Sequence, residues 1–229
     1  MSRQPIFRDR TEAGRTLSER VATSIADPDS LVLALPRGGV PVGFEVARRL
    51  HAKLDVFLVR KLGLPGQEEL AIGAIASGGI RVLNEKLVKE LDLSPSLIEQ
   101  ITAREERELK RREELYRQGQ PALPLNNRTV VLVDDGLATG ASMKAASQAL
   151  RLQGPKRIIV AVPLAAERIC DEFRGIVDEV VCAFTPEPFT AVGIWYEDFS
   201  QTSDDEVQRL LREAEHQAVL HGRKRPPGR

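Results

Sequence analysis

Residues 130–142 read VVLVDDGLATGAS. The apolar run that opens this stretch has the length and composition of a strand buried on both faces. Asp134 and Asp135 follow it directly, and a turn with Gly136 and Gly140 leads into small residues that favour the start of a helix. Free backbone N–H groups at a helix start bind phosphate, and the helix dipole assists them. The stretch therefore predicts a phosphate-binding turn between a buried strand and a helix.

The side chains of the same stretch indicate what carries the phosphate. Thr139 and Ser142 add hydroxyl donors to the backbone amides. Asp134 and Asp135 stand just ahead of the turn, where carboxylates can accept hydrogen bonds from sugar hydroxyls. We therefore expect a 5-phosphorylated ribose as ligand. The candidate 5-phosphate residues are Gly136, Leu137, Ala138, Thr139, Gly140, Ala141 and Ser142.

Other phosphate-binding motifs do not fit this stretch. A P-loop of the form GxxxxGK[ST] needs a lysine, and Ala141 stands in its place. The glycine spacing GxGxxG of a dinucleotide-binding turn is also absent. The remaining alternative is a turn whose small residues only ease packing, and two acids followed by Thr-Gly-Ala-Ser argue against it.

Outward from this stretch, apolar runs of strand length alternate with helical patterns. The expected strands are residues 31–36, 54–61, 129–135, 156–164 and 177–184. Such alternation predicts an α/β fold, with a parallel sheet flanked by helices and binding sites at the carboxyl ends of the strands.

Two regions interrupt the alternation. Residues 62–127 are too long for an ordinary connection, and we expect a loop with short strands followed by a charged helix. Ser94 or Ser96 caps that helix, Pro95 fits its first turn, and its i,i+4 Glu–Lys and Glu–Arg pairs indicate a solvated surface, with a partner-binding helix as the alternative. The three pairs are Glu106–Lys110, Glu108–Arg112 and Glu113–Arg117.

The second interruption is an aromatic loop at residues 185–201, which we expect to form a small hood. A helix over residues 203–220 follows, and the basic residues 221–229 are expected to form a disordered tail. Residues 1–220 then form one domain, with residues 62–127 as its insert.

Composition limits the classes of function. Lys plus Arg and Asp plus Glu number 33 each, so that zero net charge gives no general attraction to nucleic acid or anionic membranes. No run has the roughly 18 apolar residues of a membrane span, and the N-terminus lacks the apolar stretch of a secretory signal. Cys170 and Cys182 form no CxxC motif, so we expect a reduced, cytoplasmic protein. The three scattered histidines, His51, His216 and His221, argue against zinc and against a histidine-based nucleophile.

Residues 130–142 resemble the signature of type I phosphoribosyltransferases, which bind 5-phosphoribosyl-1-pyrophosphate (PRPP). PRPP synthetases and some transcriptional regulators share it. The resemblance covers residues 30 to 200, and with its FRDRTEAG-like N-terminus the chain is most similar to a group of uncharacterised members. It implies a type I phosphoribosyltransferase fold. PRGGV (36–40) then implies pyrophosphate binding by Arg37, Gly38 and Gly39, since a planar guanidinium and exposed amides suit an anion.

Two further stretches resemble parts of known members. VRKLGLPG (59–66) looks like the second strand of adenine and orotate phosphoribosyltransferases, which implies pyrophosphate contacts for Arg60 and Lys61. Leu64 replaces a lysine that is usual there in the adenine enzyme, and Glu68 and Glu69 are either acid/base residues or solvated loop residues.

FTAVGIWYEDF (189–199) is similar to the late loop of hypoxanthine-guanine phosphoribosyltransferases. That similarity implies stacking of a planar base on Phe189, Trp195 or Tyr196, and a contact from Asp198 to Mg²⁺–pyrophosphate. The alternative is that the aromatic rings pack the last helix onto the sheet.

The resemblance implies transfer of the phosphoribosyl group from PRPP to a nitrogenous, base-like acceptor, with Mg²⁺ as cofactor and pyrophosphate as product. Asp134, Asp135, Lys61 and Arg37 are the expected catalytic residues. A PRPP-binding regulator without turnover is the principal alternative, and a hydrolase of phosphoribosyl compounds also remains open. The sequence leaves the acceptor unidentified and a homodimer possible.

Overall fold

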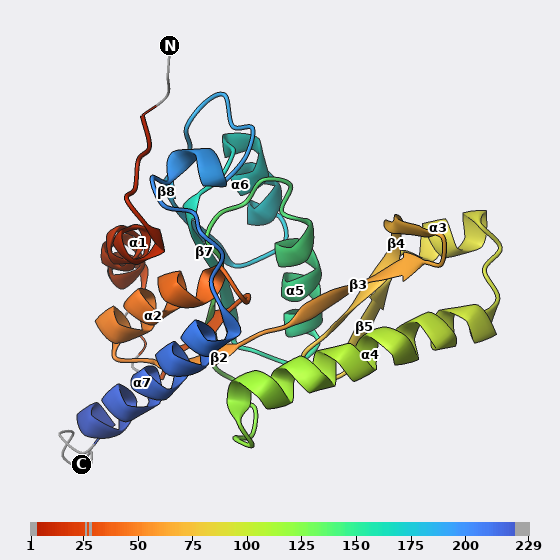
Figure 1. Cartoon of the computed structure of the whole chain (residues 1–229), viewed down its shortest axis with the longest axis horizontal. Helices are drawn as coiled ribbons and strands as arrows, with labels where there is room; N and C mark the ends of the chain where they lie inside the picture. Colours follow the sequence, from red (N-terminus) through yellow and green to blue (C-terminus); the bar gives the residue numbers. More distant parts are fainter. Residues whose placement is uncertain (1–3, 26, 28, 223–229) are drawn as a thin grey trace.

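The computed structural model describes residues 4–25, 27 and 29–222. A five-stranded parallel sheet forms its centre, with strand order β2-β1-β6-β7-β8, as Figure 1 shows in part. The strands are β1 (Leu31–Ala34), β2 (Lys53–Val56), β6 (Thr129–Val133), β7 (Arg157–Leu164) and β8 (Glu179–Phe184). The predicted parallel α/β fold is confirmed.

Helices cover both faces of this sheet because its central strands are apolar on both sides. In β6, Val131 and Val133 pack beneath α1 (Arg10–Ser24) and α2 (Gly39–Leu50). The alternate residues Val130 and Leu132 join the core formed with α5 (Ala141–Arg151) and α6 (Glu167–Arg174). This period of two places successive strand residues in opposite cores, which explains why the strand sequence is continuously apolar.

The helix α1 was not predicted, although its start carries a recognisable signal. Asp9 is the N-cap and accepts a hydrogen bond from the Glu12 backbone N–H, while the Glu12 side chain accepts one from the Arg8 N–H. An acid at the cap with a glutamate three residues later resembles a capping box. Leu17 and Val21 are fully buried and fasten the helix to the sheet.

A separate antiparallel sheet contains β3 (Val59–Leu64), β4 (Gln67–Ala76) and β5 (Ile80–Leu83). The expected single strand over residues 54–61 is wrong, because the chain changes sheets in the middle of it. The Phe57 N–H still donates to the Ala34 carbonyl of the parallel sheet, whereas the Leu58 N–H donates to Ser77 Oγ at the end of β4. The apolar pattern is continuous across this change, so it did not reveal the break.

The charged segment forms α4 (Pro95–Arg117), which runs beside the antiparallel sheet and follows the short helix α3 (Glu85–Glu90) (Figure 1). Of the two candidate caps, Ser94 is the N-cap of α4, and all three predicted i,i+4 ion pairs form, with separations of 2.7, 2.8 and 3.0 Å. The solvated interpretation holds for one side only, because Ile101, Leu109 and Tyr116 are buried on the other. Burial of that apolar stripe attaches α4 to the rest of the fold.

The aromatic loop includes the short 3₁₀ helix η1 (Gly193–Trp195), and α7 (Asp204–Gly222) follows it. The predicted helix over residues 203–220 is confirmed, with an end two residues later than expected. Most of the predicted basic tail, residues 223–229, lies outside the described residues. Among residues 4–25, 27 and 29–222, no helix combines the length and apolarity needed to cross a membrane.

Candidate functional site

The strand order places two loops of the chain side by side. β2 lies on one side of β1, and the chain later returns as β6 on the other side, with Ala34 of β1 opposite Val133 of β6. Beyond that pair, the Leu35 N–H donates to the Val133 carbonyl over 2.9 Å. In open parallel sheets such a reversal of strand order leaves a crevice outside the carboxyl ends of the strands, where ligands bind. The loops that follow β1 and β6 therefore begin side by side at this edge of the sheet.

A cleft of about 120 Å³ lies at this place. Asp134 and Ser142 line it from the β6–α5 connection, and Pro36 lines it from the end of β1. The guanidinium-bearing side chains of Arg60 and Arg112 complete it, from β3 and α4. The cleft therefore brings a carboxylate and a helix start together with two cations from the second sheet and its helix.

The β6–α5 turn is fixed by a left-handed residue and by a backbone hydrogen bond. Gly140 caps α5 with a left-handed backbone at φ +70°, and a β-carbon there would lie 2.7 Å from the Phe173 ring. The Leu137 N–H donates to the Leu164 carbonyl over 2.8 Å, which anchors the base of the turn. Thr139 and Ser142 are exposed. At the start of α5, next to these two exposed residues, the Ala141 N–H donates to Thr139 Oγ1 over 3.5 Å.

The two acids behind this turn have different surroundings. Asp134 Oδ1 accepts a hydrogen bond from the Asp135 N–H over 2.9 Å, and the side chain of Asp134 borders the cleft. Burial raises the pKa of Asp134 well above its ordinary value, and the charge of Asp135 raises it further. Burial also raises the pKa of Asp135, but Arg10 opposes that shift. Arg10 Nε lies 2.8 Å from Asp135 Oδ2.

The Pro-Arg-Gly-Gly loop after β1 backs directly onto these acids, and its Pro36–Arg37 peptide bond is cis. A β-carbon at Gly38 would overlap Asp135 Oδ2, and one at Gly39 would lie 2.8 Å from the Val133 carbonyl oxygen. The two glycines are therefore needed for close approach between the loops. The side chain of Arg37 is 31% exposed, and its Nη1 lies 3.7 Å from Asp204 Oδ1 at the start of α7.

The arginines of the cleft are held by glutamates of α4. Arg60 Nε donates to Glu105 Oε2 over 2.7 Å, and Arg112 Nε donates to Glu108 Oε1 over 2.8 Å. Lys61 is exposed and does not border the cleft, because successive residues of a strand point to opposite sides. Sequence reasoning missed Arg112, since its i,i+4 pair with Glu108 is typical of any solvated helix.

The acid/base candidates of the β3–β4 hairpin and the candidate metal contact all have exposed side chains. Glu68 and Glu69 are exposed, and the Glu68 carboxylate accepts from the Gly66 N–H over 3.2 Å. Asp198 is also exposed, and its Oδ1 accepts from the Ser200 N–H over 2.9 Å, which lowers its pKa. None of the three acids borders the cleft.

The aromatic loop is fastened to the N-terminal segment. Trp195 and Tyr196 are 6% and 4% exposed and share a cluster with Phe7. The Tyr196 hydroxyl donates to the Asp135 carbonyl over 2.7 Å, which ties the loop to the acid pair. Phe189 is half-buried and stacks on Trp195 with 6.4 Å between ring centroids. Of the three predicted base-stacking rings, Phe189 retains the most exposed surface.

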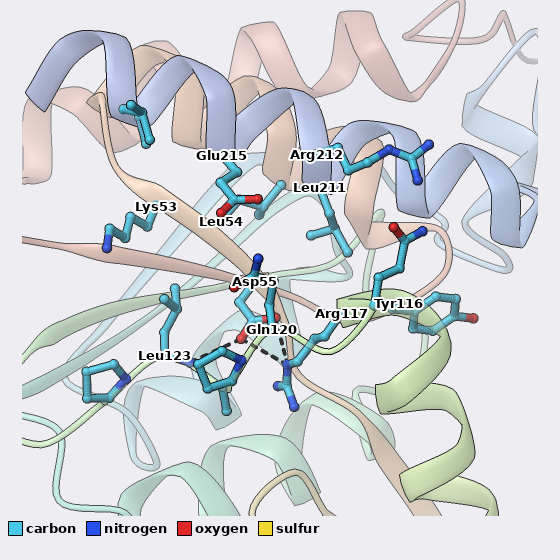
Figure 2. Close-up of a pocket in the computed structure, with 16 residues that line it drawn as sticks. Lys53, Leu54, Asp55, Tyr116, Arg117, Gln120, Leu123, Leu211, Arg212 and Glu215 are labelled. Carbon is cyan, nitrogen blue, oxygen red and sulfur yellow. Dashed lines mark hydrogen bonds and ion pairs between the residues drawn. The ribbon is translucent and has the colours of Figure 1, made fainter.

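A larger cavity, of about 730 Å³, lies elsewhere, between β2, the end of α4, the following connection and α7 (Figure 2). It shares no lining residue with the cleft. The buried pair Asp55–Arg117 forms part of its wall, with Arg117 Nε 3.0 Å from Asp55 Oδ1. The Leu123 N–H also donates to Asp55 Oδ2, over 3.3 Å. Asp55, Arg117 and the Leu123 N–H of this wall are thus engaged with one another.

The residues of the cleft fit Mg²⁺ only as a companion of a phosphorylated ligand. In the part of the chain that the structure describes, no group of three or more His, Cys, Asp or Glu side chains could hold a metal ion. Protein-bound Mg²⁺ commonly has one or two carboxylate ligands, with substrate phosphates and waters completing its octahedron. Asp134 supplies one such carboxylate at the cleft.

Several known proteins are similar to this chain over most of its length. The crystal structure of TT1426 from Thermus thermophilus is 44% identical, covers 90% of this chain and 98% of its own, and superposes with a TM-score of 0.80. Two Mycobacterium tuberculosis proteins, named "Putative phosphoribosyl transferase Rv0571c" and "Putative phosphoribosyl transferase MT0597", are each 48% identical over 209 residues. Those residues make up 91% of this chain but 47% of each relative, so the chain spans about half the length of the curated relatives it matches.

The family model described as "Phosphoribosyl transferase domain" matches residues 9–182, from the cap of α1 into β8. This range contains both loops of the crevice, the acid pair and the two arginines of the cleft. The chain belongs to the phosphoribosyl transferase domain family.

Proposed function

We propose that the protein transfers the 5-phosphoribosyl group of PRPP to a nitrogenous, base-like acceptor and releases pyrophosphate. One observation carries this proposal: a single cleft is lined by Ser142 at the start of α5, by Asp134 and by the arginines Arg60 and Arg112. PRPP has groups that these side chains can bind: a 5-phosphate, ribose hydroxyls and a pyrophosphate. The family membership of the chain supports the same reaction class.

The roles follow from the chemistry of each group. The amides of residues 136–142 and the hydroxyls of Thr139 and Ser142 would bind the 5-phosphate. Asp134 and Asp135 would accept from the ribose hydroxyls and favour positive charge on the ribose ring. Arg37, Arg60 and Arg112 would bind the pyrophosphate, for which planar guanidinium groups are well suited, with Gly38, Gly39 and Lys61 as further candidates.

In the reaction, the bond between the anomeric carbon and the pyrophosphate oxygen breaks, and its electron pair leaves with pyrophosphate. The lone pair of the acceptor nitrogen forms the new bond to that carbon, and the nitrogen then gives its proton to solvent or a nearby base. Arg37, Arg60 and Arg112 would mainly stabilise the negative charge on the departing oxygens. Mg²⁺ bound to the pyrophosphate would neutralise further negative charge, and Asp134 would be a candidate protein ligand for it.

The decisive experiment measures pyrophosphate release from Mg²⁺–PRPP in the presence of a panel of purine and pyrimidine bases and other nitrogen heterocycles. A thermal-shift screen first selects acceptors, because a bound ligand raises the apparent stability. We expect base-dependent pyrophosphate release and a ribonucleotide product. Binding of PRPP without consumption under any acceptor would favour the regulatory alternative, and absence of PRPP binding would refute the proposal.

A further inference from the structure

Arg10, in the first turn of α1, extends into the acid pair from a segment far away in the sequence. Its Nε lies 2.8 Å from Asp135 Oδ2, and the side chains of Arg10 and Asp135 are only 12% and 15% exposed. An ion pair with so little solvent around it is screened less than a surface pair and depends more strongly on its geometry. Arg10 therefore belongs to the largely buried surroundings of Asp134 and Asp135 and is not a surface charge.

Two further contacts fix the guanidinium of Arg10. Its Nη1 donates to the Ser200 carbonyl over 2.7 Å, and its Cζ lies 3.9 Å from the centroid of the Phe199 ring. From the other side, a β-carbon at Gly38 would lie 3.2 Å from Arg10 Nε. Arg10 thus brings α1, the aromatic loop and the Pro-Arg-Gly-Gly loop together around the Asp135 carboxylate.

We infer that Arg10 is a positioning residue of the ribose site, which holds the Asp135 carboxylate in a fixed orientation for a sugar hydroxyl. This inference rests on the proposed function. A carboxylate has about four acceptor positions, so one bond to Arg10 leaves room for a hydroxyl donor. The Tyr196 hydroxyl fixes the backbone of the same residue by donating to the Asp135 carbonyl. Side chain and backbone of Asp135 are therefore held by separate partners.

The planar fork of arginine is required for this role. One guanidinium donates to Asp135 and Ser200 and packs over Phe199. A lysine at position 10 has a single ammonium on a flexible stem, so that it keeps the charge but not this geometry. The charge of Arg10 and its geometry can accordingly be tested separately.

The test uses the full chain with Arg10→Met, Arg10→Lys and the control Arg8→Met. Arg8 is 64% exposed and pairs with Asp9 outside the cleft, so its loss should change no ligand affinity. Calorimetry compares inorganic phosphate, ribose 5-phosphate and Mg²⁺–PRPP. For Arg10→Met we expect about ten- to a hundredfold weaker ribose 5-phosphate and PRPP binding and unchanged phosphate binding. For Arg10→Lys we expect a smaller loss for the same two ligands, together with a melting temperature close to that of the wild type.

A double-mutant cycle separates positioning from general damage. In an Asp135→Asn background, Arg10→Met should cause little further loss of ribose 5-phosphate affinity, because the carboxylate that Arg10 orients is already gone. Equal loss of phosphate and ribose 5-phosphate affinity in Arg10→Lys, or full additivity in the cycle, would overturn the inference while leaving the proposed function intact. Wild-type protein that binds ribose 5-phosphate no more tightly than phosphate and does not bind PRPP would overturn both.

Discussion

Gly38 lies so close to Asp135 that a β-carbon on Gly38 would overlap the Oδ2 atom of that carboxylate. This contact joins the loop after β1 to the end of β6, and it leaves no room for a side chain. We predict that Gly38→Ala displaces the Asp135 carboxylate and weakens PRPP binding at least about tenfold, which is the cost of one charged hydrogen bond. Isothermal calorimetry with Mg²⁺–PRPP measures the effect.

A matched control is Gly175→Ala at the end of α6. A β-carbon there would meet its nearest neighbour, the Glu172 carbonyl oxygen, at 3.6 Å, and the backbone has φ −86°. We expect unchanged affinity for PRPP in this variant. Similar losses in both variants would show that alanine at Gly38 acts through general destabilisation.

We predict that the raised pKa of Asp134 makes the free energy of unfolding fall as the pH rises. Its pKa in the folded protein is raised above the ordinary 3.8 by burial and by Asp135, so the folded state favours the protonated acid. Stability therefore falls as the pH rises from about 4 through the raised pKa. Asp134→Asn removes the titrating carboxyl group. We therefore predict that the free energy of unfolding of this variant, relative to the wild type, increases between about pH 5 and about pH 8. Urea denaturation at the two pH values measures it, and an advantage independent of pH would contradict the prediction.

Arg112 and Arg111 are adjacent and both bind Glu108, but only Arg112 borders the cleft. We predict that Arg112→Met weakens the binding of pyrophosphate and PRPP by about tenfold or more and leaves ribose 5-phosphate binding unchanged. Arg111, which is 61% exposed, gives the control variant Arg111→Met, with no change for either ligand. Titration of both variants with pyrophosphate and ribose 5-phosphate decides this, and equal effects of the two substitutions would remove Arg112 from the site.

Arg37 and Thr139 should separate the two anion sites. Arg37→Ala is expected to weaken PRPP much more than ribose 5-phosphate, which has no pyrophosphate. Thr139→Val is expected to weaken both ligands similarly, because both have the 5-phosphate. Direct titration with both ligands measures the contrast. If Arg37→Ala weakens both equally with an unchanged melting temperature, Arg37 does not contact pyrophosphate.

Arg117 and Asp55 test the wall of the larger cavity. Their side chains are 11% and 9% exposed, and the Asp55 carboxylate also accepts from the Leu123 N–H (Figure 2). Arg117→Met leaves a buried carboxylate without its cation, so we predict a loss of about 3–5 kcal/mol in the free energy of unfolding. The double variant Arg117→Met/Asp55→Leu should recover part of that loss, because it removes the unpaired charge. Chemical denaturation gives both values, and a single variant as stable as the wild type would contradict the prediction.

The parallel sheet and the turn at residues 136–142 could be predicted from local sequence patterns. The signals are continuous apolar runs, helical patterns that alternate with them, and two acids followed by Gly, Thr and Gly. Each signal lies within a short stretch of sequence, so a local pattern suffices to predict the sheet and the turn. The cap at Ser94 and the three ion pairs of α4 were predictable for the same reason, since residues four apart on a helix are always neighbours.

Which charges meet in space depends on how distant segments of the chain pack together. The apolar run over residues 54–61 contains no signal for the change of sheet, which depends on Leu58 and Ser77, nineteen residues apart. Arg10 reaches Asp135 across 125 positions of the chain, and Arg112 enters the cleft from a helix whose sequence looks fully solvated. An ion pair forms only when its two charged groups lie close together. For residues far apart in the sequence, that distance depends on how the sheet, α1 and α4 pack. Local sequence spacing does not encode this packing.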